Sequence, residues 1–243
     1  MRAYIEAIND KLQNTNFMAL SPLSYHVERF GNEREPVVVI DNFSESLERL
    51  KQRAFKADFK AGAAYYPGVQ APEDPNYLSL RGRELTEIFS NIFNNNSPLR
   101  IESCVYSIVC APPGKLLAGQ CLPHYDGFEA ALFASVHYIQ GPASAGTAFY
   151  RHKRTGFETV SEGRNETYRM ALKQDISEFG LPPNHYFYGD DERYEMIGEI
   201  KAEPDRLILY RGYTLHSGCI SSDVLLNPNP PTARLTLNSF LIA

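Results

Sequence analysis

The sequence predicts a mainly β protein of the α+β class: an antiparallel sandwich with helices packed outside it. The first observation is a set of strand-like runs in the C-terminal part, at residues 101–110, 131–140, 147–151, 206–210 and 233–242. The second is that helices do not alternate regularly with these runs, as they would in a parallel α/β sheet. The third is the length of 243 residues, one domain's worth of chain for a sandwich or barrel.

The N-terminal part of the chain is predicted to be mostly helical. Apolar residues at helical spacing predict a short helix within residues 5–12. The run 36–40, Pro-Val-Val-Val-Ile, is typical of a buried strand. Ser44 then predicts the N-cap of a second helix, and the apolar spacing over 85–92 predicts a third. The stretch 65–76 contains three prolines and a glycine, so we expect a loop there.

We predict one domain spanning residues 1–243. Residues 1–98 form its helical N-terminal support, and residues 99–243 form the β core. A charged, loop-like insertion of about residues 152–199 interrupts the core strands, and Asn165 is predicted to cap its one helix. Such a long insertion serves either as a functional element, for example a lid over a substrate, or as a packing decoration.

Composition and charge exclude several classes of protein. Acidic residues outnumber basic ones, 29 to 24, which argues against a general binder of nucleic-acid backbones. No run approaches the ~20 apolar residues that span a bilayer, and acidic residues stand where a secretory signal would be apolar. The four cysteines have no CxxC or disulfide-scaffold spacing, which predicts reduced thiols in a cytoplasmic protein. The one dense basic run, residues 151–154, is either a solvated face or a surface that attracts an acidic substrate.

Three residues form a candidate metal site. In the segment 122–127, Leu-Pro-His-Tyr-Asp-Gly, His124 and Asp126 are two residues apart, and such residues face the same side of a strand. His216 follows a predicted strand and turn, just before Ser-Gly. Two histidines and one carboxylate are the facial triad suited to non-haem Fe(II), and they leave three coordination positions open.

A residue suited to binding a dicarboxylate follows the candidate metal ligands. Arg234 begins an alternating strand, which places Arg234 and Thr236 on one face. An arginine deep in a pocket holds a carboxylate through two parallel hydrogen bonds. The arrangement therefore predicts a metal centre with an anion site beside it.

These motifs resemble the Fe(II)- and 2-oxoglutarate-dependent oxygenases, nearest to the prolyl-4-hydroxylase-like branch. The residues 38–43, Val-Val-Ile-Asp-Asn-Phe before a helix, resemble the usual entry to the domain. The residues 136–139 and 146–149 resemble the tyrosine strand and the glycine-threonine-phenylalanine strand that follow the HxD motif. The resemblance implies a double-stranded β-helix, a cupin-like jelly roll, with flanking helices and a long insertion.

The resemblance also implies roles for individual residues. Three residues match the iron ligands of the family: His124, Asp126 and His216. Arg234 matches the partner of the distal carboxylate of 2-oxoglutarate, with Thr236 as a hydroxyl donor and Tyr106 as a weaker candidate for the same carboxylate. The chain departs from the branch in having Arg234 where lysine is common. It also has Ala-Pro-Pro-Gly at 111–114, where the branch has a tyrosine near the HxD motif.

The implied activity is a dioxygenase reaction with Fe(II), 2-oxoglutarate and O₂. Decarboxylation of 2-oxoglutarate to succinate is coupled to hydroxylation of a small molecule, an amino acid or a peptidyl substrate. The charge balance and the lack of a long apolar run predict no nucleic-acid or membrane partner, and the oligomeric state is not predicted.

Two rival interpretations stay open. One is a non-catalytic binding module stabilised by a tetrahedral zinc ion, with four ligands: Cys121, His124, His216 and Cys219. It needs tight turns, because residues three apart on a strand face opposite sides. The other is a catalytically silent jelly roll that binds metal without turnover.

Overall fold

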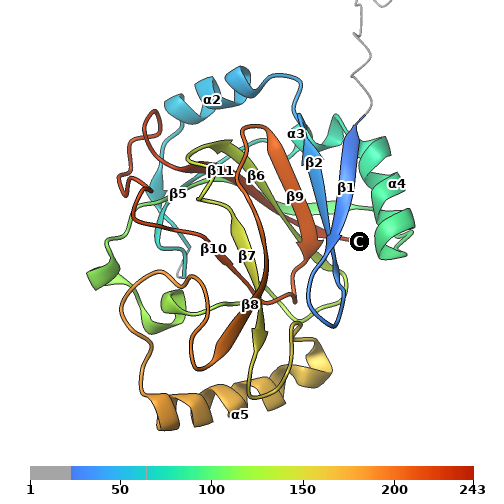
Figure 1. Cartoon of the computed structure of the whole chain (residues 1–243). Coiled ribbons are helices and arrows are strands. Elements are labelled where there is room, and N and C mark those ends of the chain that lie inside the picture. Colours follow the sequence, from blue (N-terminus) through green and yellow to red (C-terminus); the bar gives the residue numbers. More distant parts are fainter. Residues whose placement is uncertain (1–22, 64) are drawn as a thin grey trace, which may run out of the picture.

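Two antiparallel sheets lie face to face in this protein (Figure 1). The computed structural model describes residues 23–63 and 65–243, and the helix predicted within residues 5–12 lies outside them. Among the described residues, the large sheet has eight strands in the order β1-β2-β9-β6-β11-β5-β4-β3. The small sheet has three strands in the order β10-β7-β8.

The core strands are divided between the two sheets, and the chain crosses from one sheet to the other several times. The large sheet takes β5 (Arg100–Val109), β6 (Leu132–Gln140), β9 (Arg206–Arg211) and β11 (Leu235–Ile242). The small sheet takes β7 (Thr147–His152), β8 (Tyr194–Ile200) and β10 (His216–Gly218). This winding is that of a double-stranded β-helix, so the predicted fold class is confirmed. Each of the five predicted C-terminal runs forms a strand.

The N-terminal segment contains more strand than the sequence predicted. Its described residues, 23–63 and 65–98, contain the helices α2 (Leu47–Lys56), α3 (Asn76–Ser79) and α4 (Gly82–Phe93). They stand among the strands β1 (Ser24–Arg29), β2 (Pro36–Asp41), β3 (Lys60–Ala61) and β4 (Gly68–Pro72). The predicted strand at 36–40 is thus joined by three further strands in the part expected to be mostly helical, and part of the predicted loop 65–76 is β4. Proline is tolerated at Pro72 because β3 pairs only with Val69 and Gln70, so one side of β4 is a free edge at this position. The cap of α2 is Ser46, whose side chain accepts from the Arg49 amide, rather than Ser44.

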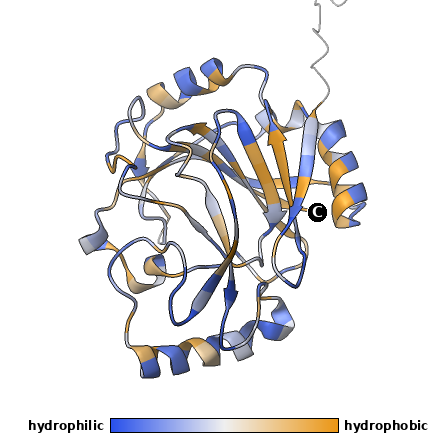
Figure 2. Cartoon of the chain, viewed as in Figure 1, coloured by the Kyte–Doolittle hydropathy of each residue, from blue (hydrophilic) through white to orange (hydrophobic). Residues whose placement is uncertain are grey.

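Burial on both faces explains the continuous apolar run of β2. Val38 and Ile40 pack in the core between the large sheet and helices α2 and α4. Val37 and Val39 pack in a second core between the two sheets, with Phe149 of the small sheet. A strand covered on both faces has no polar alternation. Figure 2 shows this apolar stretch in β2 and its neighbour β9.

The insertion is shorter than predicted and lies outside the sandwich. Its helix α5 (Glu162–Phe179) begins after Ser161 rather than at Asn165. The last part of the predicted insertion is the core strand β8, whose glutamates and glycine conceal its strand character. Tyr168 of α5 packs with Tyr150, on the face of the small sheet opposite Phe149. None of the helices in the described part of the chain is long and apolar enough to cross a membrane.

Candidate metal centre

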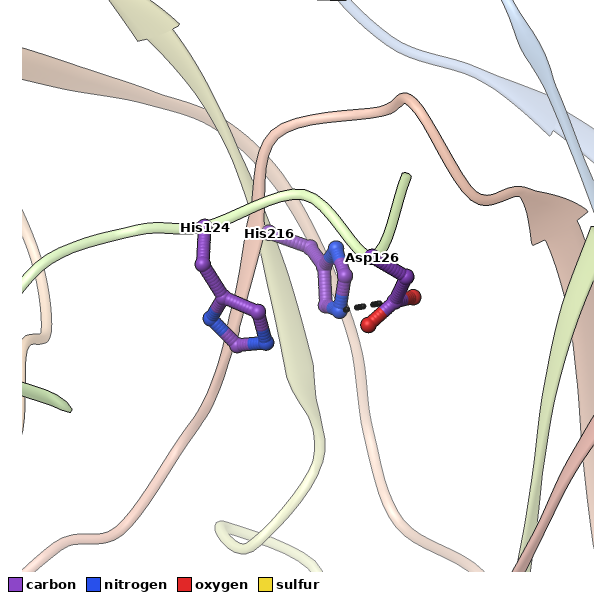
Figure 3. Close-up of side chains that lie close together, drawn as sticks. All are labelled: His124, Asp126 and His216. Carbon is purple, nitrogen blue, oxygen red and sulfur yellow. Dashed lines mark ion pairs between the residues drawn. The ribbon is translucent and has the colours of Figure 1, made fainter. Parts of the chain in front are cut away.

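Three predicted ligands meet at one end of the small sheet (Figure 3). The ligand atoms of His124, Asp126 and His216 all lie within 4.8 Å of one another. The His216 Nε2 atom is 3.7 Å from the Asp126 Oδ2 atom, and the two imidazole rings have their centroids 4.4 Å apart. Such spacing allows one cation to contact all three side chains.

Backbone hydrogen bonds hold the three residues together. His124 and His216 exchange two N–H···O bonds of 2.8 Å, although they are 92 positions apart in the chain. The Asp126 amide donates to the Gly212 carbonyl at 2.7 Å. The segment with His124 and Asp126 is an isolated bridge followed by a bend, so the prediction of a regular strand there is wrong. The two side chains still converge, because the segment is locally extended at the bridge.

The second ring nitrogen of His216 is fixed by the backbone. Its Nδ1 lies 2.9 Å from the Thr214 carbonyl oxygen, which accepts a hydrogen bond from it. The proton on Nδ1 leaves the Nε2 lone pair directed toward Asp126. The Tyr210 ring packs edge-on against His216 with centroids 4.9 Å apart and restricts its rotation. His216 therefore presents one nitrogen in a defined direction.

The surrounding protein shifts the protonation of all three groups toward their neutral forms. Burial, with a smaller contribution from the neighbouring His216, lowers the pKa of His124 to about 4. Burial also lowers the pKa of His216 to about 4 and raises that of Asp126 to about 6. Solvent still reaches the His124 ring. At pH 7 both imidazoles are neutral and Asp126 is mostly ionised, which is the state that ligates a divalent cation.

The cysteines are not part of this group. A metal site needs at least three His, Cys, Asp or Glu side chains close together. Among the described residues, the group that meets this condition consists of His124, Asp126 and His216. The Cys121 thiol instead lies 3.5 Å from the Leu117 carbonyl oxygen. Cys219 packs in the apolar cluster under α5, where burial raises its pKa to about 12. The zinc arrangement with Cys121 and Cys219 is therefore wrong for this structure.

Arg234 is buried without a carboxylate partner among the described residues. It is 8 % exposed, and its Nε donates to the Ala145 carbonyl at 2.9 Å. Arg234 also lies close enough to Tyr66 and Tyr138 to lower their pKa values electrostatically, against the larger raising effect of burial. A buried guanidinium that lacks a counter-ion is costly unless an anion binds to it.

The sequence did not assign the polar residues that accompany Arg234. Tyr138 hydrogen bonds to Thr147 at 2.7 Å across the two sheets, and both belong to motifs quoted above without a role. Tyr66 stands in a proline-rich stretch where no periodic pattern marks it. The pairing of β4 with β5, of β5 with β11 and of β11 with β6 brings Tyr66 and Tyr138 to the same region.

Thr236 and Tyr106 lie on opposite faces of the large sheet. Thr236 is buried, pairs with Tyr138 on β6 and donates to the Ser107 carbonyl at 3.4 Å. Tyr106 faces the helices, and its hydroxyl donates to the Leu50 carbonyl at 3.1 Å. The structure thus does not bring Tyr106 to Arg234, because a shift of one position along a strand reverses the face.

The basic run 151–154 is neutralised within the fold. Arg151 pairs with Glu158 at 2.6 Å and with Glu195 at 2.7 Å, and Arg154 pairs with Asp175 at 2.5 Å. The Lys153 ammonium donates to the Asp191 carbonyl. Both arginines of the run are therefore paired with carboxylates within the fold.

Fold and site together define a jelly-roll protein with a candidate His-Asp-His metal centre. The chain belongs to the family of unknown function DUF6445, whose profile matches residues 21–241. No curated protein matches the sequence.

Several solved structures are similar at low identity. One is the non-heme alpha ketoglutarate dependent epimerase SnoN from nogalamycin biosynthesis, with 14% identity, a TM-score of 0.46, and coverage of 86% of this chain and 78% of that one. Another is HygX from Streptomyces hygroscopicus with nickel, 2-oxoglutarate and hygromycin B bound, with 11% identity, a TM-score of 0.42, and coverage of 86% and 83%. A third is an N-substituted L-amino acid dioxygenase from Burkholderia ambifaria AMMD, with 13% identity, a TM-score of 0.40, and coverage of 90% and 94%.

Proposed function

We propose that this protein is an Fe(II)- and 2-oxoglutarate-dependent dioxygenase that hydroxylates its substrate. The observation that carries the proposal is the convergence of His124, Asp126 and His216 within 4.8 Å in a double-stranded β-helix. Two neutral imidazoles and one carboxylate fit the facial triad of non-haem Fe(II). A bound Fe(II) supplies the redox chemistry by which O₂ and 2-oxoglutarate yield succinate and an oxidised substrate.

Arg234 supports 2-oxoglutarate as the co-substrate. Its buried guanidinium lacks a carboxylate partner in the described chain, and a distal carboxylate would satisfy it through charge-assisted hydrogen bonds. Thr236 lies on the face turned toward the small sheet, and its hydroxyl would serve the same carboxylate if it turned away from the Ser107 carbonyl. Phe149 and Tyr210, both buried between the sheets, exclude water from the neighbourhood of His216.

The substrate belongs to the class of small molecules, amino acids or peptidyl groups in this proposal. The motifs at 136–139 and 146–149 support the prolyl-4-hydroxylase-like branch. The paired state of the basic run 151–154 gives no support to a strongly acidic substrate.

Anaerobic reconstitution tests the proposal. Protein mixed with Fe(II) is expected to bind one equivalent of iron, and 2-oxoglutarate should then produce a charge-transfer absorption band. Exposure to O₂ with pools of metabolites, amino acids and peptides should release succinate. The proposal fails if no iron binds or no band forms. Iron binding and a band with no succinate from any pool would instead support the silent jelly roll.

A further inference from the structure

Tyr125 stands between two proposed metal ligands and points away from them. It is flanked by His124 and Asp126, and successive side chains of an extended segment point in opposite directions. The Tyr125 hydroxyl donates to the Asn165 Oδ1 atom of helix α5 at 2.8 Å. Its ring meets Tyr168 of the same helix edge-on, with centroids 5.9 Å apart. The segment that carries two ligands is thus attached to the insertion.

Helix α5 is itself fixed to the small sheet by a buried polar network. The Tyr168 and Tyr194 hydroxyls are 2.7 Å apart. His152 Nε2 of β7 lies 2.6 Å from the Asp175 carboxylate, and both side chains are almost fully buried. Satisfied networks of this kind hold one arrangement, because any displacement leaves buried polar groups unpaired.

A second attachment holds the N-terminal end of α5. Arg164 donates to the Glu33 carboxylate at 2.6 Å, in the turn between β1 and β2. The buried Glu158 carboxylate accepts from the Asn32 and Glu33 amides at 2.8 Å each. The helix is therefore anchored both to the small sheet and to the edge of the large sheet.

The ligand segment has little other support. It forms no regular strand, and its backbone hydrogen bonds to the rest of the described chain reach His216 and Gly212. Rotation of the segment about its own direction would move the His124 and Asp126 side chains together. Tyr125, held on the opposite side, resists that rotation.

We propose that Tyr125 and Asn165 are positioning residues, and that helix α5 acts through them as a brace for the metal-binding segment. This inference rests on the proposed function, since it takes His124, Asp126 and His216 as the metal ligands. It gives the insertion a role that is not that of a lid: α5 fixes ligand geometry from outside the sandwich.

Metal affinity of the full chain tests the brace. Ni(II) and Co(II) dissociation constants are measured by calorimetry at a temperature far below unfolding, and the Co(II) visible spectrum reports ligand geometry. We expect Tyr125→Phe and Asn165→Ala each to weaken binding by about tenfold, since groups that orient ligands typically contribute 10–100-fold. The double variant should bind metal no more weakly than either single variant, because both changes remove the same hydrogen bond. Asn165→Asp, which keeps an oxygen acceptor, should restore most of the affinity.

Tyr186→Phe is the matched control. It removes a hydroxyl bond of 2.7 Å to the Ala111 carbonyl, on another loop. It should leave both the dissociation constant and the Co(II) spectrum unchanged. The brace is overturned if Tyr125→Phe and Asn165→Ala lower the melting temperature but bind metal with unchanged affinity and spectrum. Wild-type protein that binds neither metal would refute the proposed function itself, a separate and recognisable outcome.

Discussion

Buried charged side chains in this protein generally have a partner of opposite charge. Arg193 pairs with Asp191 at 3.1 Å, and Glu158 pairs with Arg151 at 2.6 Å. Arg234 is also buried, yet among the described residues its hydrogen-bond partner is the uncharged Ala145 carbonyl. Since an uncompensated buried charge is costly, this one residue carries information about a ligand.

Loss of Arg234 should weaken co-substrate binding selectively. Charge-assisted hydrogen bonds contribute about 1.5–3 kcal/mol, so Arg234→Ala should raise the dissociation constant of 2-oxoglutarate by roughly 10–100-fold. Calorimetry on the Ni(II)-loaded protein measures this. Metal affinity should change little, and Arg206→Ala, which removes an ion pair with Asp41, is the control. Equal 2-oxoglutarate affinity in Arg234→Ala would refute the assigned role.

Replacement of Asp126 distinguishes the oxygenase interpretation from the zinc-stabilised binding module. Asp126→Ala removes the only carboxylate of the candidate site, so metal affinity should fall by more than about 100-fold. Cys121→Ser should retain metal, because its thiol does not share the ligand group. Equilibrium dialysis with metal analysis measures both variants. Loss of metal in Cys121→Ser but not in Asp126→Ala would favour the zinc-stabilised binding module.

At the scale of elements, the turn between β1 and β2 depends on one glycine. Gly31 has a φ of +59°, and an added Cβ would meet the Glu158 carboxylate, which is held by the turn's own amides. Gly31→Ala should therefore destabilise the fold by about 1–3 kcal/mol. Gly163→Ala in α5, where an added Cβ meets nothing within 4 Å, is expected to be neutral or stabilising. Urea unfolding measures both, and equal stabilities would contradict the argument.

Acid should loosen the attachment of α5 through His152. Burial lowers the pKa of this histidine, and its hydrogen bond with Asp175 offsets part of the effect. Below the unfolded value of about 6.5, the unfolded chain binds a proton that the folded chain does not. The free energy of unfolding should thus fall as the pH drops below about 6.5, by at most about 1.4 kcal/mol per unit for this group. Urea unfolding of the metal-free proteins between pH 7.5 and 5 measures this. The free energy of unfolding should depend less steeply on pH in His152→Gln than in the wild type. Parallel curves for the two proteins would refute the role assigned to His152.

At the scale of the molecule, ligand binding should couple to global stability. A metal that binds only the folded state adds about 2.7 kcal/mol at 100 times its dissociation constant. For a chain of this length that raises the melting temperature by about 5–10 °C. Calorimetric melting should show a further rise with 2-oxoglutarate only when metal is present. A rise with 2-oxoglutarate alone would mean that its site is independent of the metal.

The strands of the core and the three candidate metal ligands could be predicted from the sequence. Apolar alternation is a local property, so each predicted C-terminal run proved to be a strand. His124, Asp126 and His216 belong to short motifs with distinctive residue types. The strand β8 was missed because two glutamates and a glycine interrupt its apolar residues, so it has no regular apolar alternation.

Contacts between distant segments were decided only by the tertiary structure. Register placed Thr236 toward the small sheet and Tyr106 toward the helices, which composition alone does not distinguish. Folding brought Tyr66 and Tyr138 to Arg234, and helix α5 to Tyr125. The sequence by itself determined which chemical groups are available and which elements carry them. Their surroundings depend on pairings across the whole chain, because a one-residue change of register moves a side chain to the other face of its sheet.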